Sequence, residues 1–244
     1  MNITGKWFGR DCFEFDFEGR RAMLVYPEKA DEKKNWSLKT EYRDAFPETE
    51  LALLDLGFHV AHLENVSRFA TPEDCDAKAR FVKYLHEEMG LRDKCVPVGM
   101  SCGGAHAINF AGYHPECVQC MFIDAPVLNF CDFPGRIGAK FASVWDNEFI
   151  KAYPGMTRAK LFNFEYHPIN RVPVIKERKI PILMVYGTED ETVCYDMNGR
   201  LMELEYEDFP ELLTVMAREG QGHHPHGFPD NPKIITDFIV KHCD

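Results

Sequence analysis

A serine stands between two glycines in residues 99–103, Gly-Met-Ser-Cys-Gly. The apolar run 95–98 precedes this segment and the small-residue stretch 104–108 follows it, so the pattern predicts a strand, a sharp turn and a helix with Ser101 at the apex. Glycines suit such a turn because the backbone leaves no room for a Cβ atom where it passes close to its neighbours. The hydroxyl of Ser101 would then project from the end of a sheet. The backbone N–H of Cys102 would face the oxygen of the group that the Ser101 hydroxyl attacks.

A serine hydroxyl is a weak nucleophile at neutral pH, so it needs a base to accept its proton and an acid to orient that base. Two later segments each follow a predicted strand: 187–193 contains Asp190, and 220–227 contains His223. The carboxyl ends of parallel strands lie at one edge of a sheet, so both segments are expected beside Ser101. The order serine, aspartate, histidine is the order known for one class of hydrolytic sites.

Other carboxylates compete with Asp190 for the orienting role. Glu189 and Glu191 adjoin it and are interpreted as solvated loop charges. Asp124 follows the buried strand predicted over 120–125, so it would reach the same edge of the sheet. Asp190 is favoured, and Asp124 is the alternative.

Histidines also compete for the role of base, since three of them lie within four positions. His223 follows a Gly-x-Gly turn, where a short loop can swing an imidazole toward the serine, and it is the favoured base. His224 and His226 are interpreted as structural or pocket-lining. The run His-His-Pro-His could instead bind a metal, but no acidic or Cys ligand stands at fitting spacing close by. His106, on the helix after the serine, is interpreted as a packed core histidine.

The elements that would position these residues follow from hydrophobic periodicity. Alternating Phe and acidic residues at 13–17 and the apolar run 21–26 predict an N-terminal antiparallel hairpin. Strands and helices then alternate, which predicts a mostly parallel sheet covered by helices on both faces. The expected strands are 57–63, 95–98, 120–125, 180–186 and 212–216, and the clearest helices are 72–90 and 232–240.

The interval 131–179 interrupts this alternation. It contains eight Phe, Trp and Tyr side chains with several Gly and Pro residues and no clear strand. Such an insertion between two strands would form a lid over the site, which would exclude water from it. The alternatives are that the aromatic residues form only the insertion's own core, or that they form a dimer surface.

With these motifs together, the chain resembles the α/β-hydrolase superfamily. The matching parts are the serine turn 99–104, the Gly-x-x-Asp-x-x-Val segment 187–193 and the Gly-x-Gly-His segment 220–223, and the resemblance runs from about residue 20 to the end. The double glycine after the serine is similar to prolyl-oligopeptidase-like, dienelactone-hydrolase-like and carboxylesterase-like branches. The resemblance implies an α/β-hydrolase fold with Ser101 as nucleophile, Asp190 as orienting acid and His223 as general base. It implies no metal or organic cofactor.

An oxyanion hole in this family needs a second N–H donor besides that of Cys102, on the loop after an early strand. The usual His-Gly-Gly motif is absent from the segment that follows the strand ending at Tyr26-Pro27. We expect the backbone N–H of Trp36, at the far end of that segment, to be the donor. Trp36 could equally anchor the loop in the core. The thiol of Cys102 is expected to take no part, since Ser101 occupies the nucleophile position.

Composition narrows the class of protein further. A chain of 244 residues with 45% hydrophobic content can form one large core, so 1–244 is expected to be a single domain with 131–179 inserted. Lys+Arg number 28 and Asp+Glu 39, and the resulting net charge of -11 would repel nucleic acid.

Nine scattered cysteines indicate reduced thiols rather than a disulfide framework or a zinc or redox site at Cys117 and Cys120. With no targeting or membrane-spanning segment evident, a soluble cytoplasmic protein is expected.

These observations predict a serine hydrolase that cleaves a small carboxylic ester through an acyl-serine intermediate. An acylated sugar or other polar ester would suit Arg68, Asn65 and Glu41, which are expected to line the mouth of the site. Two other functions stay open. One is a small serine peptidase or amidase, which would cleave aminoacyl amides in preference to esters. The other is a catalytically silent binding protein on the hydrolase fold, which is disfavoured because serine, acid and base are all present.

Overall fold

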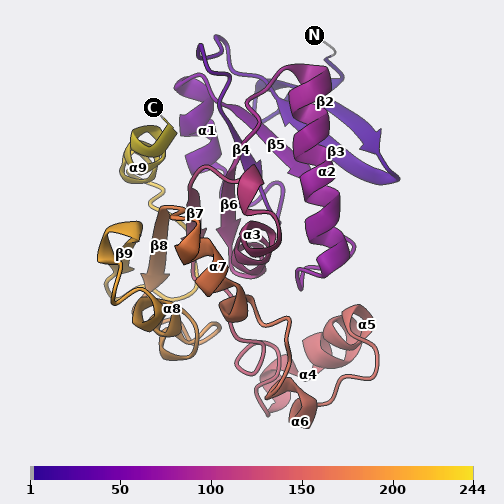
Figure 1. The fold of residues 1–244 in the computed structure, drawn as a ribbon, viewed down its shortest axis with the longest axis vertical. Helices are drawn as coiled ribbons and strands as arrows, with labels where there is room; N and C mark the ends of the chain where they lie inside the picture. The colour runs from indigo at the N-terminus through magenta and orange to yellow at the C-terminus, as the bar shows by residue number, and fades with distance from the viewer. Residues whose placement is uncertain (1–2, 244) are drawn as a thin grey trace.

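The computed structural model describes residues 3–243 and shows a nine-stranded sheet with helices on both faces (Figure 1). The order of the strands across the sheet is β1-β2-β3-β5-β4-β6-β7-β8-β9. Their bounds are β1 Gly5–Trp7, β2 Arg10–Phe17, β3 Arg20–Val25, β4 Trp36–Lys39, β5 His59–Leu63, β6 Val96–Met100, β7 Met121–Asp124, β8 Ile182–Gly187 and β9 Leu213–Arg218.

The first three strands are antiparallel to their neighbours, and the rest of the sheet is parallel. β2 and β3 form the predicted hairpin, and β3 pairs antiparallel with β5. From β5 to β9 every neighbouring pair is parallel. The expected fold class is therefore confirmed. Because parallel strands share one direction, the loops after β4, β6, β7, β8 and β9 all leave the same edge of the sheet.

Helices cover both faces because each face of a parallel sheet is apolar. One face packs against α2 (Pro72–Met89), α3 (Cys102–Tyr113), α7 (Val172–Glu177) and α8 (Gly199–Glu205). The other face packs against α1 (Glu48–Asp55) and α9 (Lys233–Cys243). The bounds of α2 follow the sequence closely: Thr71 accepts a hydrogen bond from the N–H of Asp74 at the start, and Gly90 ends the helix with a φ of 68°. No helix within residues 3–243 combines the length and apolarity needed to cross a membrane.

Strand β4 is an element that hydrophobic patterning alone missed. Two of its four residues are polar, yet all four are buried. Lys39 is accommodated there because its Nζ lies 2.8 Å from Oε1 of Glu50 on α1, with both side chains fully excluded from solvent. A buried charge is tolerated when it is paired in this way. β4 pairs with β5 on one side and with β6 on the other, so it lies next to the strand that carries the serine turn.

The interval after β7 holds short helices, α4 (Ala142–Val144), α5 (Ile150–Ala152) and α6 (Arg158–Leu161), which form a lobe beyond the edge of the sheet (Figure 1). All of its aromatic residues except Phe162, which is 80% exposed, pack in one cluster, but not only with one another. The cluster also includes Phe69 from the loop before α2, and Cys102 and Ala105 from α3. The last part of the interval does not belong to this lobe. Val172 and Ile175 on α7 pack in the hydrophobic core between the sheet and helices α2 and α3.

Candidate active site

The serine turn has the strained geometry that the glycine pattern predicts. Ser101 follows β6 and precedes α3 with a φ of 55° and a ψ of -121°, outside the regions that non-glycine residues usually occupy. A Cβ atom on Gly99 would lie 2.3 Å from the carbonyl oxygen of Gly103, and one on Gly104 would lie 2.5 Å from Cβ of Pro126. The glycines therefore permit the close approaches that hold the serine at the end of its strand.

The structure brings together the three side chains that the sequence singled out. Nε2 of His223 lies 3.0 Å from Oγ of Ser101, and Nδ1 of the same ring lies 2.6 Å from Oδ2 of Asp190. Since a carboxylate only accepts, Nδ1 carries the proton, and Nε2 is left to accept the hydrogen bond of the serine hydroxyl. Ser101 is 8% exposed. The three groups form one connected chain of hydrogen bonds, of which Ser101 and His223 line a cavity and the side chain of Asp190 is buried behind them.

Asp190 is held as a carboxylate by its surroundings. Burial alone would raise its pKa, but hydrogen bonds from His223 and from the N–H groups of Val193 and Thr192 hold its pKa below the usual 3.8. The loops on which Asp190 and His223 lie are joined, since the N–H of Glu189 donates to the carbonyl of Gln221 at 2.8 Å. The exposed side chains of Glu189 and Glu191 are consistent with solvated loop charges.

Asp124, the alternative acid, lies in a different arrangement. Its buried carboxylate accepts hydrogen bonds from Nη2 of Arg218 at 3.0 Å and from the N–H of Gly227. Its Oδ1 lies 3.5 Å from Nδ1 of His226. Asp124 thus contacts the segment behind His223 rather than His223 itself.

The other histidines of the segment surround His223. His224 is exposed and its ring stacks on Phe46 at 5.3 Å between centroids, whereas His226 is buried with its ring nearly perpendicular to the same phenylalanine. Partial burial and the neighbouring imidazoles lower the pKa of His224. Both line the cavity in front of Ser101, as interpreted from the sequence.

Trp36 does not reach this cavity, and the prediction of its N–H as oxyanion donor is wrong. Trp36 begins β4, and the register of β4 on β6 pairs Ser37 with Val96. It therefore lies at the end of the sheet opposite to Ser101, where its buried indole Nε1 donates to the carbonyl of Arg92 at 2.9 Å. The second reading of Trp36, as a core anchor, agrees with this contact.

The loop at the correct end of β4 contributes Tyr42. Its backbone has a φ of 53°, and it lines the cavity together with Ser101. Just before it, Oγ1 of Thr40 donates to the carbonyl of Gly103 at 2.7 Å, which fixes the loop against the serine turn. The sequence contains one indication of this loop, the polar stretch that precedes α1. That stretch can be assigned to the edge of the sheet near Ser101 only when β4 is known to be a strand.

The side chain of Cys102 is buried under the turn, and its burial raises the pKa of the thiol to about 11. The thiol is therefore protonated at neutral pH. The N–H of Cys102, in contrast, belongs to the first residue of α3, where backbone N–H groups have no partner within the helix.

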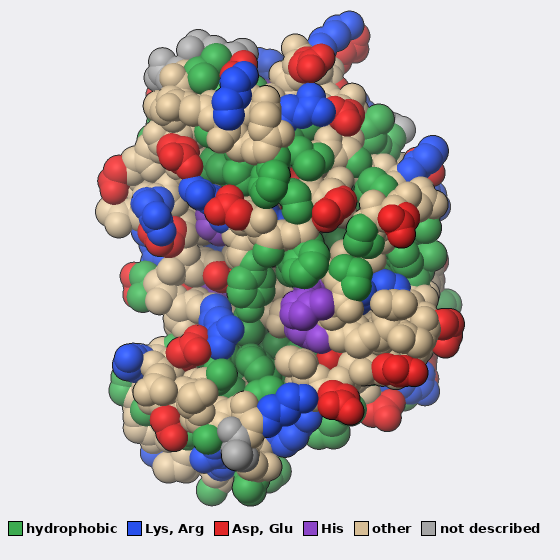
Figure 2. Space-filling view, turned by 180° about the vertical axis from the view of Figure 1, so that it is seen from behind, with side chains coloured by type: hydrophobic (Ala, Val, Ile, Leu, Met, Phe, Trp, Pro, Cys, Tyr) green, Lys and Arg blue, Asp and Glu red, His purple; other side chains and the backbone are tan. Residues whose placement is uncertain are grey.

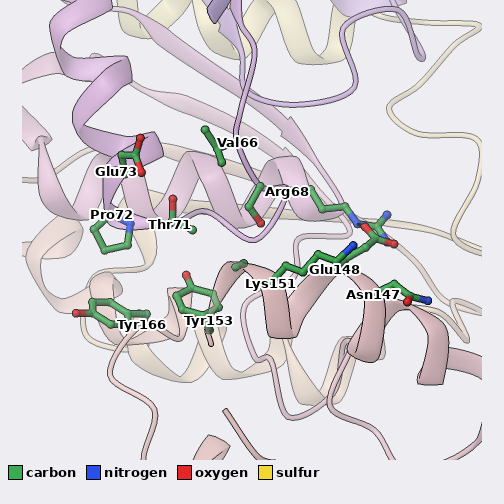
Figure 3. Close-up of a pocket in the computed structure, with 12 residues that line it drawn as sticks. Val66, Arg68, Thr71, Pro72, Glu73, Asn147, Glu148, Lys151, Tyr153 and Tyr166 are labelled. Atoms are coloured by element: carbon green, nitrogen blue, oxygen red, sulfur yellow. Dashed lines mark hydrogen bonds and ion pairs between the residues drawn. The ribbon is translucent and has the colours of Figure 1, made fainter. Parts of the chain in front are cut away.

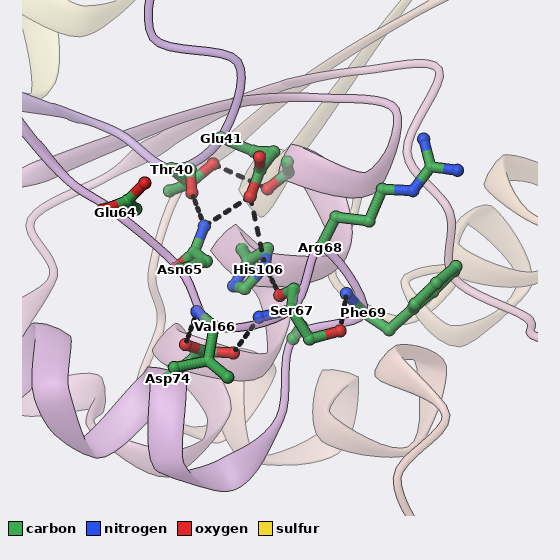
Figure 4. A network of polar contacts seen from close by, with 12 residues as sticks. Thr40, Glu41, Glu64, Asn65, Val66, Ser67, Arg68, Phe69, Asp74 and His106 are labelled. Carbon is green, nitrogen blue, oxygen red and sulfur yellow. Dashed lines mark hydrogen bonds and ion pairs between the residues drawn. The ribbon is translucent and has the colours of Figure 1, made fainter. Parts of the chain in front are cut away.

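A buried polar network joins α3 to the loops beside the site (Figure 4). Nζ of Lys78 lies 3.2 Å from Nδ1 of His106, whose Nε2 donates to the carbonyl of Ser67 at 2.9 Å. Asn65 joins the network by donating to Oε2 of Glu41 at 2.5 Å. His106 is fully buried, as expected for a packed core histidine. Asn65 and Glu41 were expected at the mouth of the site, but they line a different groove.

The cavity in front of Ser101 has a volume of about 310 Å³ and a largely aromatic wall. Figure 2 shows histidine side chains at the surface with hydrophobic side chains beside them. Its lining residues are Tyr42, Ala45, Phe46, Arg68, Met100, Ser101, Phe133, Thr192, His223, His224 and His226. Phe133 comes from the insertion, so the insertion contributes to the wall of the cavity.

A second, larger groove of about 630 Å³ adjoins this cavity at Arg68 (Figure 3). It lies between the loop before α2 and the insertion, with Glu148 and Lys151 on the insertion's side. Nε of Arg68 lies 2.7 Å from Oε2 of Glu148. Arg68 therefore belongs to both hollows and connects the loop before α2 with the insertion.

Several solved structures share this architecture. The chain superimposes on acylaminoacyl peptidase from Pyrococcus horikoshii with a TM-score of 0.72, at 14% identity, over 95% of this chain and 41% of the peptidase. S-formylglutathione hydrolase from Agrobacterium tumefaciens gives a TM-score of 0.70 at 16% identity, over 99% of both chains. Est1E from Butyrivibrio proteoclasticus gives 0.67 at 15% identity, over 95% of this chain and 98% of that one.

No protein-family model matches the sequence, and no curated protein matches it either. The structural likeness nevertheless extends over nearly the whole chain, and these solved structures are α/β-hydrolases. The chain therefore has the α/β-hydrolase fold, as its motifs indicated.

Proposed function

We propose that this protein is a serine hydrolase that transfers an acyl group from a small carboxylic ester to water. The observation that carries the proposal is the connected chain Ser101, His223 and Asp190, with distances of 3.0 and 2.6 Å between the bonded atoms. A fold alone would not indicate hydrolysis, because one fold hosts many functions. The proposal rests on the chemistry that this particular geometry permits.

In the proposed reaction, Oγ of Ser101 attacks the ester carbonyl while Nε2 of His223 accepts its proton. Asp190 keeps the imidazole in the required tautomer and stabilises the cation that forms. The N–H groups of Cys102 and Tyr42 would stabilise the oxyanion. His223 then returns the proton to the leaving alcohol, and a water molecule repeats the sequence to release the acid. Each such component contributes roughly 10²–10⁴ in rate.

The size of the cavity supports a small substrate. About 310 Å³ lies at the lower end of the range for ligand pockets, and the insertion forms one wall through Phe133. We propose that the insertion acts as a lid, with Arg68 and Glu148 joining it to the loop before α2. The neighbouring groove at Arg68 would hold whatever part of the substrate extends beyond the cavity. A soluble, cytoplasmic location is part of the same proposal.

Labelling with a fluorophosphonate probe tests the proposed nucleophile. The wild-type protein should react covalently, and Ser101→Ala should not, while its circular dichroism spectrum stays unchanged. Ser143→Ala is a matched control, since Ser143 lies in the insertion at α4. An unlabelled wild-type protein would instead favour a silent binding protein, and continued labelling of Ser101→Ala would contradict the assignment of the nucleophile.

A panel of esters and amides with graded chain lengths tests the substrate class. Short-chain esters should be hydrolysed faster than aminoacyl amides of the same size. The structural match to acylaminoacyl peptidase makes the amides a necessary comparison, and faster cleavage of the amides would replace the esterase proposal with an amidase.

A further inference from the structure

Three imidazoles form a compact group at one end of the cavity. The ring centroids of His223, His224 and His226 lie 4.8 to 4.9 Å from one another, with the ring planes at 67° to 89°. One ligand nitrogen from each ring lies within 4.8 Å of those of the other two. The proposed hydrolysis uses only His223. We infer that the three histidines also form a binding site for a divalent transition metal such as Zn²⁺, which inhibits the hydrolase.

The carboxylates behind the rings support metal binding. Nδ1 of His223 contacts Asp190 at 2.6 Å, and Nδ1 of His226 lies 3.5 Å from Oδ1 of Asp124. In metal sites, histidine ligands usually donate the N–H of their second nitrogen to a carboxylate, which fixes the ring and raises the basicity of the ligating nitrogen. His223 has such a hydrogen-bonded carboxylate, and Asp124 lies 3.5 Å from the same nitrogen of His226, so Nε2 is the nitrogen left to each of these two rings for a metal.

The donor set selects the class of metal. Three neutral imidazoles suit Zn²⁺, Cu²⁺ and Ni²⁺, whereas Mg²⁺ and Ca²⁺ prefer oxygen ligands. With Zn–N bonds of about 2.1 Å, nitrogens of a tetrahedral site lie about 3.4 Å apart, so the group must contract. His224 can supply this movement because it is exposed at the surface, whereas the ring of His223 is held by its hydrogen bond to Asp190 and His226 is buried.

Binding of the metal and hydrolysis exclude one another. The lone pair of Nε2 of His223 accepts the proton of Ser101 in the proposed reaction, across the 3.0 Å contact. The same lone pair would form the bond to the metal, so the base is unavailable while the metal is bound. This inhibitory consequence rests on the proposed function, but the binding of metal does not.

Calorimetric titration of the full chain with ZnCl₂, after removal of metals by a chelator, tests the site. Wild type should bind one Zn²⁺, and His224→Ala should weaken the affinity by about 10-fold or more. His242→Ala, on α9, is the matched control and should bind like wild type. MgCl₂ should give no binding. Ester hydrolysis by wild type should fall on addition of ZnCl₂ and recover with chelator, and inhibition of His224→Ala should need about 10-fold more metal.

Equal zinc affinity in wild type and His224→Ala would overturn the inference, as would hydrolysis that ZnCl₂ leaves unchanged. Ser101→Ala separates the two proposals, because it should still bind zinc although it lacks the nucleophile. Zinc binding through His224 in a wild-type protein that cleaves no ester would refute the proposed function and leave the metal site standing.

Discussion

Asp124 and Arg218 form a buried ion pair beneath the segment that carries His223, with Nη2 of Arg218 3.0 Å from Oδ1 of Asp124. The side chain of Asp124 is 0% exposed and that of Arg218 is 6% exposed. The other carboxylate oxygen accepts the N–H of Gly227. Asp124 ends β7 and Arg218 ends β9, so the pair ties the histidine segment to two strands of the sheet. Two carboxylates thus contact one histidine loop: Asp190 accepts a hydrogen bond from the ring of His223, and Asp124 accepts one from the backbone N–H of Gly227.

Asp124→Asn is expected to destabilise the fold and lower kcat. Loss of the charge leaves Arg218 as a buried cation without its partner, which costs about 3–5 kcal/mol. Urea unfolding gives the stability, and ester hydrolysis gives kcat. Asp237→Asn is the control, since Asp237 pairs with Lys233 at the exposed surface and the change should alter stability by less than about 1 kcal/mol. Equal stability of the two variants would show that the buried pair does not anchor the loop.

Asp190→Asn is expected to lower kcat by roughly 10³–10⁴-fold, because the amide no longer holds the imidazole in the required tautomer. KM should change little, since Asp190 lies behind His223 and does not line the cavity. The neighbouring variant Glu189→Gln removes an exposed carboxylate one residue away and should retain wild-type kcat. A loss of activity in Glu189→Gln as large as in Asp190→Asn would mean that the acid has been misassigned.

Gly104→Ala is expected to destabilise the protein by about 1–3 kcal/mol, as overpacking of a core does. The new methyl group would lie 2.5 Å from Cβ and 2.7 Å from Cα of Pro126, so α3 must move away from the segment after β7. Thermal and urea unfolding measure the change. Gly5→Ala is the matched control, because its nearest neighbour would be Sγ of Cys12 at 3.8 Å. If both variants were as stable as wild type, the close packing at Gly104 would not be required.

His62 is expected to make stability fall on acidification. Burial lowers its pKa to about 4, against the usual 6.5, and its Nδ1 donates to the carbonyl of Lys39 at 2.8 Å. Between these two values the unfolded chain binds a proton that the folded chain does not, so stability rises with pH in this window. From pH 6.5 down to pH 5 the loss attributable to His62 should be about 1.6 kcal/mol.

Urea unfolding of wild type and His62→Gln at several pH values checks this prediction. The variant should show a shallower fall of stability between pH 6.5 and 5. The test compares the two proteins with each other, because burial also lowers the pKa of His106. His106 therefore adds its own loss of stability on acidification in both proteins. Parallel curves for the two proteins would mean that His62 does not contribute.

Local sequence determined the serine turn and the two loops that meet it. Each depends on short-range chemistry: glycines where a Cβ atom would collide, apolar runs that become strands, and polar residues directly after them. Because these runs are buried on both faces of a parallel sheet, their identity as strands was evident without any knowledge of the fold. The grouping of Ser101, Asp190 and His223 follows from the shared direction of those strands.

Only the tertiary structure decided which residues stand beside that group. β4 contains the buried residues Ser37 and Lys39, and the ion pair that makes Lys39 acceptable comes from Glu50 on a helix farther along the chain. Because β4 was not predicted, the loop expected to face Ser101 was placed after β3, with Trp36 at its far end. In the structure that loop follows β4 and contains Tyr42. Likewise, Asp124 ends β7 and Asp190 comes shortly after the neighbouring strand β8, and their order in the chain does not say which one reaches the histidine. That choice depends on distances between loops that are far apart in sequence, which local patterns do not encode.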